Sequence, residues 1–191
     1  IKDGKQIKGG IESHLKAGIA MVPRNRKERG ILNDLSISDN LSMGFFNTKL
    51  KSLLISPKKE RERFKRRQED LSIRADRPSN PITSLSGGNQ QKVILGRWLE
   101  ADADILLFDN PTQGIDVGTK YEIYKLMLSL SAQGKSIIMF SSEFAEIMKV
   151  SDRCIVMFRG EINKILNRDE ISEESLMYYS TGAIIEERKH A

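Results

Sequence analysis

Two patterns of hydrophobic residues alternate along much of this 191-residue chain. Apolar runs of strand length occur at 19–22, 105–109, 136–141, 153–158 and 161–166, and Arg159-Gly160 separates the last two. Segments with helical spacing lie between them, at 89–100, 118–132 and 143–150. Apolar strands that alternate with helices are typical of domains in which helices cover a parallel sheet. The sequence therefore predicts an α/β fold with a mostly parallel sheet, and a hairpin formed by the last two strands.

A different, purely helical pattern fills the segment between residues 31 and 83. Capping residues from Ser36 onward begin one helix, and Ser56-Pro57 places a cap before a proline at the first position of another. We expect this second helix to run to about Arg74, with Phe64 and Leu71 on one narrow apolar stripe. The segment is predicted to be a small helical subdomain.

The excess of basic residues is confined to one part of the chain. Lys and Arg number 31 against 26 Asp and Glu, and residues 58–67 hold seven basic and two acidic residues, which leaves 24 of each sign elsewhere. This distribution argues against a surface built throughout for nucleic acid. Within residues 58–67, Glu60 and Glu62 form pairs along a solvated helix, or the segment is a basic patch for nucleic acid or an anionic membrane.

Cysteine content and hydropathy restrict the compartment. The single cysteine, Cys154, cannot form an intramolecular disulfide, and no apolar run approaches the 18 or so residues of a spanning helix. We therefore expect a chain that works in a reducing, cytoplasmic compartment and does not cross a membrane by itself.

A glycine pair just before the helix at 89–100 is the first candidate for chemistry. Ser86, Gly87 and Gly88 lead into that helix, where backbone N–H groups and a serine hydroxyl point outward. Such a helix start suits an anion, and a phosphate best of all. A plain capped helix explains the same residues.

The second candidate lies at the end of a buried strand. Asp109 ends the apolar run at 105–109, a position where open α/β sheets bind ligands and where a carboxylate holds Mg²⁺ beside a nucleotide phosphate. The following residue, Asn110, stands where a hydrolytic enzyme of this layout would carry its base. An amide cannot take a proton from water.

These segments together resemble the nucleotide-binding domain of ABC transporters. Residues 85–90 resemble the signature motif, residues 105–109 Walker B and residues 112–116 the D-loop, in the expected order. The chain has Gly-Asn-Gln-Gln-Lys in the signature, Gly-Ile-Asp-Val-Gly after Walker B and Ser-Ser-Glu after the next strand. These forms are most similar to the second ATPase half of bacterial simple-sugar importers of the ribose and galactose type. The resemblance implies a P-loop NTPase-like fold with ATP and Mg²⁺ as cofactors.

The resemblance also implies site residues and a division of the chain. Residues 1–30 would be an N-terminal remnant of the ATPase core, 31–83 a helical subdomain facing the permease, 84–170 the core itself, and 171–191 a C-terminal helix and tail. Asp109 would bind the metal, Asn110 occupies the usual position of the catalytic glutamate, and Glu143 that of the switch histidine. The residues expected to bind nucleotide are Ser86, Gly87, Gly88, Asn89, Gln90 and Asp116.

The implied role is that of an ATP-binding subunit in sugar import. In the family, two such domains face each other head to tail, so this signature would reach the γ-phosphate of ATP held by a partner domain. The implied partners are that second domain, permease subunits and, indirectly, a sugar-binding protein, with no nucleic acid expected. The chain would lie on the cytoplasmic face of the membrane as a peripheral subunit.

Departures from the family pattern make the two ATP sites unequal. No Gly-x-x-x-x-Gly-Lys-Ser/Thr loop occurs, so we expect Walker A upstream of Ile1 and no hydrolysis by the isolated chain, and no Q-loop glutamine follows Val22. Asn110 in place of glutamate predicts slow hydrolysis at this half's own site. Two alternatives remain open, namely a non-hydrolytic regulatory domain and an ABC-type ATPase that acts on nucleic acid or ribosomes.

Overall fold

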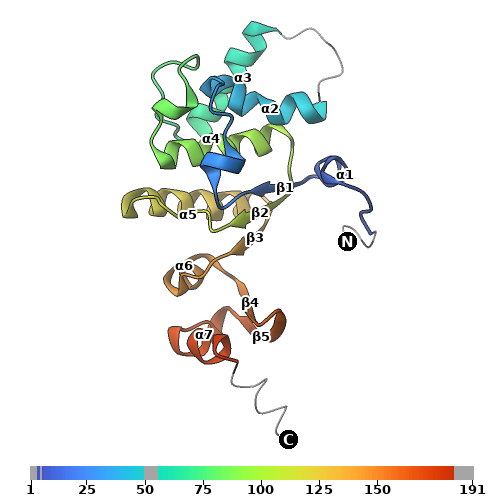
Figure 1. Ribbon diagram of the computed structural model, residues 1–191, viewed down its shortest axis with the longest axis vertical. Coiled ribbons are helices and arrows are strands. Elements are labelled where there is room, and N and C mark those ends of the chain that lie inside the picture. Colours follow the sequence, from blue (N-terminus) through green and yellow to red (C-terminus); the bar gives the residue numbers. More distant parts are fainter. Residues whose placement is uncertain (1–3, 5, 50–55, 183–191) are drawn as a thin grey trace, which may run out of the picture. The chain divides into compact units, whose positions relative to one another are not determined.

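The computed structural model describes residues 4, 6–49 and 56–182, and the chain forms two compact units (Figure 1). Unit 1 extends to Phe140 and unit 2 begins at Ser141. This boundary falls inside the range 84–170 that the sequence analysis assigned to one core. Each unit is described by itself.

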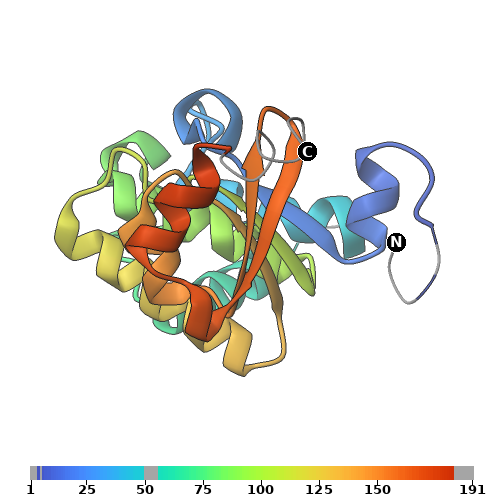
Figure 2. The same cartoon turned by 90° about the horizontal axis from the view of Figure 1, so that it is seen from below.

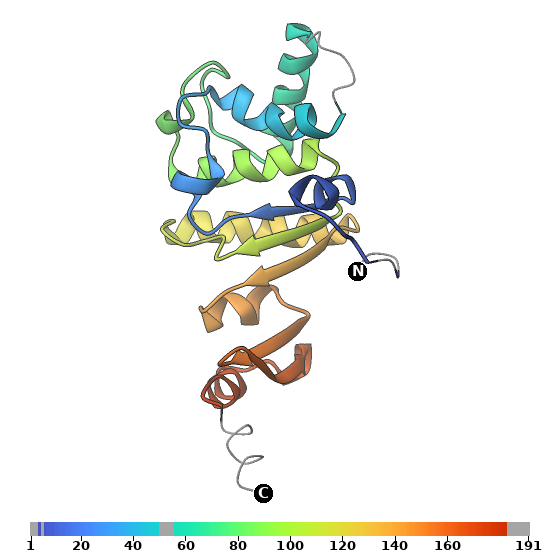
Figure 3. The ribbon, with the colours of Figure 1, turned by 45° about the vertical axis from the view of Figure 1, so that its right-hand side comes forward.

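Unit 1 is built on a short parallel sheet. Strands β1 (Ile19–Val22), β2 (Ile105–Asp109) and β3 (Ser136–Phe140) lie in the order β1-β2-β3 and all run in the same direction, as Figure 3 shows. The register aligns Ile19 with Ile105 on one side of β2, and Leu107 with Ile138 on the other. The prediction of a parallel sheet is confirmed, and β3 ends one residue earlier than expected.

The two faces of this sheet differ in burial. Ala20, Val22, Leu106 and Phe108 alternate with their neighbours and are fully buried, where α4 (Gly87–Glu100) contacts β1 and α5 (Val117–Ala132) contacts β3. On the opposite face Met21, Ile138 and Phe140 are each about half exposed. Helices α4 and α5 thus cover the buried face of an alternating sheet.

Two further helices of unit 1, α2 (Ile37–Lys49) and α3 (Pro57–Asp70), pack on each other, and α2 also packs on α4. Phe64 and Leu71 are buried there, as the apolar stripe predicted. Helix α3 ends at Asp70 instead of near Arg74, because Ser72 adopts a left-handed conformation with φ of 50°. Unit 1 also contains α1 (Ile11–Lys16), the π-helical turn η1 (Arg26–Gly30) and the 3₁₀ turn η2 (Ile82–Ser84).

Helices α2 and α4 approach each other so closely that one contact leaves no room for a side chain. A Cβ atom at Gly44 would overlap the backbone carbonyl oxygen of Arg97. Backbone of a packed helix cannot move aside as the end of a flexible side chain can. Gly44 is therefore required for this contact.

Gly44→Ala should destabilise the protein by about 2–3 kcal/mol, because overpacking at a rigid contact forces the helices apart. The free energy of unfolding in urea measures the effect. Gly10→Ala is the matched control, since a Cβ at Gly10 meets no atom within 4 Å. Equal stabilities of the two variants would contradict the close approach.

A buried arginine joins α4 to the segments before it. Arg97 donates from Nε to the carbonyl oxygen of Asn40 at 2.7 Å, from Nη1 to that of Gly30 at 2.7 Å, and from Nη2 to Oδ1 of Asn40 at 2.9 Å. Burial lowers the pKa of Arg97 to about 10, so the side chain stays charged at neutral pH. Asn40 in turn bonds both backbone groups of Leu32.

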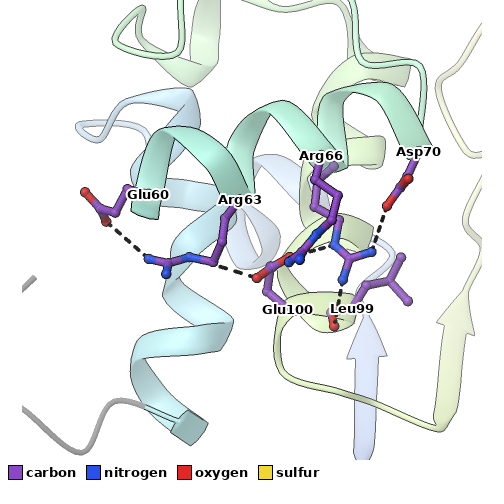
Figure 4. A network of polar contacts seen from close by, with 7 residues as sticks. Glu60, Arg63, Arg66, Asp70, Leu99 and Glu100 are labelled. Carbon is purple, nitrogen blue, oxygen red and sulfur yellow. Dashed lines mark hydrogen bonds and ion pairs between the residues drawn. The ribbon is translucent and has the colours of Figure 1, made fainter. Parts of the chain in front are cut away.

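The basic segment 58–67 is only partly a solvated surface. Arg66 and Arg67 donate to the buried carboxylate of Glu100 at 2.9 and 2.7 Å, and Arg63 lies 4.0 Å from it (Figure 4). Glu60 pairs with Arg63 along α3 at 4.0 Å, the intrahelical pairing that the solvated-helix interpretation expected. Three of the seven basic side chains therefore converge on α4, which neither sequence interpretation predicted.

Unit 2 is an antiparallel hairpin with helices packed on it. Strands β4 (Arg153–Phe158) and β5 (Glu161–Asn167) pair, and α7 (Glu173–Ser180) packs against both (Figure 2). The unit also contains α6 (Phe144–Val150) and the 3₁₀ turn η3 (Arg168–Glu170). The hairpin prediction is confirmed, and β5 extends one residue further than expected.

Val156, Leu166 and Leu176 form the core of unit 2. Cys154 packs against this cluster but is only partly buried, and that burial raises the pKa of its thiol.

No helix in the described part of the chain has both the length and the apolar character needed to cross a bilayer.

Candidate functional site

The glycine pair lies inside helix α4, not before it. The helix begins at Gly87, with Ser86 as its N-cap, two residues earlier than the sequence pattern predicted. The side chain of Ser86 forms no capping hydrogen bond, and the first helical hydrogen bond runs from the N–H of Gln90 to the carbonyl oxygen of Ser86 at 2.9 Å. The N–H groups of Gly87, Gly88 and Asn89 therefore have no acceptor within the helix.

Both glycines lie close to side chains of neighbouring segments. A Cβ atom at Gly88 would overlap the methyl group of Thr119 on α5, and one at Gly87 would overlap Nη2 of Arg26. The glycine pair predicted close approach of a ligand. The structure adds that both glycines also let neighbouring segments approach the start of α4.

The other polar residues of the signature segment hold its loop in place. Oδ1 of Asn89 accepts from the N–H of Arg74 at 2.8 Å, and its Nδ2 donates to Oγ of Ser86 at 3.0 Å. Gln90 is buried and donates from Nε2 to the carbonyl oxygens of Ile82 and Leu85. In this structure Gln90 shapes the loop before α4, whereas Ser86 is exposed at its tip.

A buried lysine next to the signature segment connects α4 to α5. Lys92 donates from Nζ to the carbonyl oxygen of Ser72 and to Oε2 of Glu122, both at 2.9 Å. Lys92 and, more weakly, Arg74 lower the pKa of Glu122. The lysine thereby keeps the body of α4 fixed relative to α5.

Asp109 and Asn110 lie at the carboxyl end of β2, as predicted. Oδ1 of Asp109 accepts from Nδ2 of Asn110 at 3.1 Å, and the N–H of Asn110 donates to the carbonyl oxygen of Phe140 at 2.9 Å. Asn110 has a φ of 44°, in the left-handed region that asparagine tolerates better than most residues. The amide side chain is therefore held beside the carboxylate.

Asp116 caps helix α5. Its Oδ1 accepts from the N–H of Thr119 at 2.9 Å and its Oδ2 from the hydroxyl of the same residue at 2.7 Å. These hydrogen bonds lower the pKa of Asp116. The residue that the resemblance assigned to nucleotide binding thus has a structural role at the end of the D-loop.

Two arginines that the sequence analysis gave no role also contact the D-loop. Arg24 donates from Nε to Oε1 of Gln113 at 2.8 Å, and Arg26 donates to the carbonyl oxygens of Gln113 and Gly114 at 3.1 and 3.4 Å. They lie almost 90 residues before the D-loop in the sequence, so no local pattern indicates the contact.

Glu143 belongs to unit 2, at the N-cap position of α6, and is exposed. Its N–H donates to Oγ of Ser141 at 3.0 Å, and that hydroxyl donates to the buried carboxylate of Glu146 at 2.5 Å. This pair of hydrogen bonds holds the segment before α6 in a defined turn.

The described residues contain no cluster of three or more His, Cys, Asp and Glu side chains able to hold a metal ion. Mg²⁺ beside a nucleotide needs only one or two carboxylates, because phosphate oxygens and water complete its shell. Asp109 at the end of β2 fits that limited requirement.

Comparison with known protein families shows to which family the chain belongs. The family model described as ABC transporter matches residues 1–113, more than half of the chain. The chain belongs to the ABC transporter family. The match ends within the D-loop, so it includes β1, the signature segment at the start of α4, and Asp109 on β2.

Curated relatives within the ABC transporter family are sugar-import proteins by name. The ribose import ATP-binding protein RbsA of Halalkalibacterium halodurans is 45% identical over 94% of this chain and 36% of its own length. The xylose import ATP-binding protein XylG of Pseudomonas savastanoi is 42% identical over 85% of this chain and 32% of its own. The chain spans about a third of the length of these relatives.

Solved structures of ABC cassettes share the fold. A dimeric ATP-binding cassette in a post-hydrolysis state with ADP and Pi matches with a TM-score of 0.72 and 20% identity, over 88% of this chain and 72% of that one. An ATP-binding cassette of an ABC transporter matches with a TM-score of 0.72 and 21% identity, over 88% of this chain and 70% of that one. The α/β, P-loop NTPase-like fold expected from the resemblance is confirmed.

Proposed function

We propose that this chain is part of the ATP-hydrolysing subunit of a bacterial sugar ABC importer, and that its signature segment serves the ATP site of a partner nucleotide-binding domain. The observation that carries the proposal is the uncapped start of α4. Ser86 is exposed there, three backbone N–H groups lack helical acceptors, and the first turn contains no acidic residue. Such an end attracts a phosphate through both its N–H groups and the helix dipole.

The polar residues divide into those that meet the phosphate and those that hold the segment. Ser86, Gly87, Gly88 and Asn89 would present the hydroxyl and the three N–H groups to the γ-phosphate. Gln90 would act as a positioning residue, because its amide is already bonded to the backbone of the preceding loop. Asp116 would likewise position the D-loop through its cap on α5.

The chain's own ATP site would be of lower activity than the partner's. Asp109 would hold Mg²⁺, which when bound supplies positive charge against the phosphates. Asn110 donates to Asp109 and cannot accept a proton from water, so this half lacks the base beside its carboxylate. Glu143 stands at the position of the switch histidine and is exposed at the start of α6.

The difference between the two sites can be measured with Asn110. Asn110→Ala and Asn110→Gly in the full-length protein should change steady-state ATP hydrolysis far less than the loss of about 10²–10⁴ typical of removing a general base. Glycine serves as the control for backbone strain, because it accepts the positive φ at this position without cost. Mutation of the catalytic glutamate on the partner half supplies the reference loss. Equal losses of ATP hydrolysis on mutation of Asn110 and of the partner's glutamate would refute the proposal that the two ATP sites differ in activity.

The partners follow from the proposed import role. The chain would work with a second nucleotide-binding domain and with permease subunits, and indirectly with a sugar-binding protein, on the cytoplasmic face of the membrane. The ribose and xylose named for its relatives indicate a pentose-type substrate class. Copurification with permease subunits tests this assignment, and their absence from the purified complex would contradict it.

One observation favours a second candidate, a non-hydrolytic domain that regulates the partner ATPase. Asn110 leaves the chain's own site without a base. A regulatory domain would raise partner hydrolysis even when both Asp109 and Asn110 are replaced. Single-site ATPase measurements on such a variant separate the two candidates.

A further inference from the structure

Arg26 lies where the D-loop and the start of α4 meet. Its Nη1 donates to the carbonyl oxygen of Gln113 at 3.1 Å, and its Nη2 to that of Gly114 at 3.4 Å. Arg24 bonds the side chain of the same Gln113. The segment that follows β1 therefore holds the D-loop through both its backbone and its side chain.

The same guanidinium group faces the signature segment. A Cβ atom at Gly87 would overlap Nη2 of Arg26, which places that nitrogen directly against the first residue of α4. One side chain thus touches the D-loop and the helix start at once. Movement of either segment would disturb the contact with the other.

The charge of Arg26 is not neutralised within the described part of the chain. There it donates only to backbone carbonyls and forms no ion pair, and its Nε is buried without a hydrogen-bond partner. The first turn of α4 contributes no acidic residue either. A full positive charge thus stands beside a helix end that itself carries a partial positive charge.

We propose that Arg26 is a positioning residue of the signature site, which fixes the spacing between the D-loop and the start of α4 and adds positive charge where a phosphate would approach. This inference rests on the proposed function, because it assigns Arg26 to the same site. It explains why a cation occupies a place next to a helix N-terminus, where a cation is unfavourable unless an anion arrives. Two charge-assisted hydrogen bonds compensate for part of that cost.

The test uses the full-length protein with Arg26→Ala, Arg26→Lys and the control Arg29→Ala. Arg29 is an exposed arginine on the same short helix η1. Amide hydrogen exchange at residues 113–116 and at Gln90, the first hydrogen-bonded N–H of α4, reports the spacing without any nucleotide, and kcat and KM for ATP report its consequence. Ser86→Arg is measured in parallel.

Arg26→Ala should raise the exchange rates in both segments by about 10-fold. It should also lower kcat by about 10-fold, with KM little changed. Both effects have the order expected for the loss of hydrogen bonds from a charged donor. Arg26→Lys should recover part of kcat, because it keeps the charge but lacks the planar fork that reaches two carbonyls. Arg29→Ala should behave as the wild type.

Each contrary outcome overturns a different statement. Unchanged exchange in Arg26→Ala overturns the bridge between the two segments. Raised exchange with unchanged kcat, while Ser86→Arg abolishes hydrolysis, overturns the role of Arg26 and leaves the proposed function standing. Intact hydrolysis in Ser86→Arg overturns the proposed function and, with it, the phosphate role of Arg26.

Discussion

Replacement of Ser86 by arginine in the full-length protein should lower ATP turnover by about 100-fold or more, the order seen when a donor to developing charge is lost. Ser86 is exposed at the tip of the uncapped start of α4, so a long side chain there would occupy the volume through which, in the proposed function, a γ-phosphate approaches. The same side chain would obstruct the surface of the proposed partner domain. Transport, which depends on turnover, should fail with it.

The fold should survive this substitution. The Ser86 side chain is exposed and accepts a hydrogen bond from Nδ2 of Asn89 in the first turn of α4. Ser131→Arg is the matched control, because Ser131 is also exposed but lies near the far end of α5. Steady-state ATPase assays with reconstituted complexes measure the effect, and full activity in Ser86→Arg would end the head-to-tail assignment.

Glu100→Ala should lower the free energy of unfolding by about 3 kcal/mol, because removal of one partner from a buried ion pair leaves uncompensated charge. The Glu100 side chain is 3% exposed, and it accepts from Arg66 and Arg67 while Arg63 lies nearby. Two of these arginines are themselves largely buried, with 13% and 19% of the Arg63 and Arg67 side chains exposed. Without the carboxylate, α3 loses three polar contacts with α4, while the hydrogen bond from Nη2 of Arg67 to the carbonyl oxygen of Leu99 at 3.5 Å remains.

Arg66→Ala supplies the comparison for this network. More than half of the Arg66 side chain is exposed, so its loss should cost about 1 kcal/mol or less. Urea unfolding measures both variants, and hydrogen exchange along α3 locates the damage. A Glu100→Ala variant no less stable than Arg66→Ala would show that the network does not hold α3 on α4.

The local pattern of apolar residues predicted the buried strands well. The runs at 19–22 and 105–109 became β1 and β2 within their predicted bounds, because alternating or continuous apolar residues determine which strands are buried. Helix ends were less well predicted. Helix α3 stops four residues before the expected end through a left-handed Ser72, a backbone conformation that no apolar spacing reveals.

The sequence predicted the local positions of the candidate residues but not their hydrogen-bond partners. Ser86 and Asp109 lie at a helix start and a strand end, as their neighbours along the chain indicated. Gln90 and Asp116, which the resemblance predicts at the nucleotide, bond within the chain to the preceding loop and to Thr119. Spacing along the chain cannot distinguish a residue that meets a ligand from one that holds its neighbour.

The sequence by itself determined the family, the α/β class and the order of signature, strand-end aspartate and D-loop, because these depend on residues that are close together in the chain. Only the tertiary structure decided that Arg26 joins the D-loop to the start of α4, and that basic residues of 58–67 converge on Glu100. The partners in both contacts are separated by more than 30 residues. Folding brings them together through the packing of α4 on its neighbours, and that packing is a property of the whole unit.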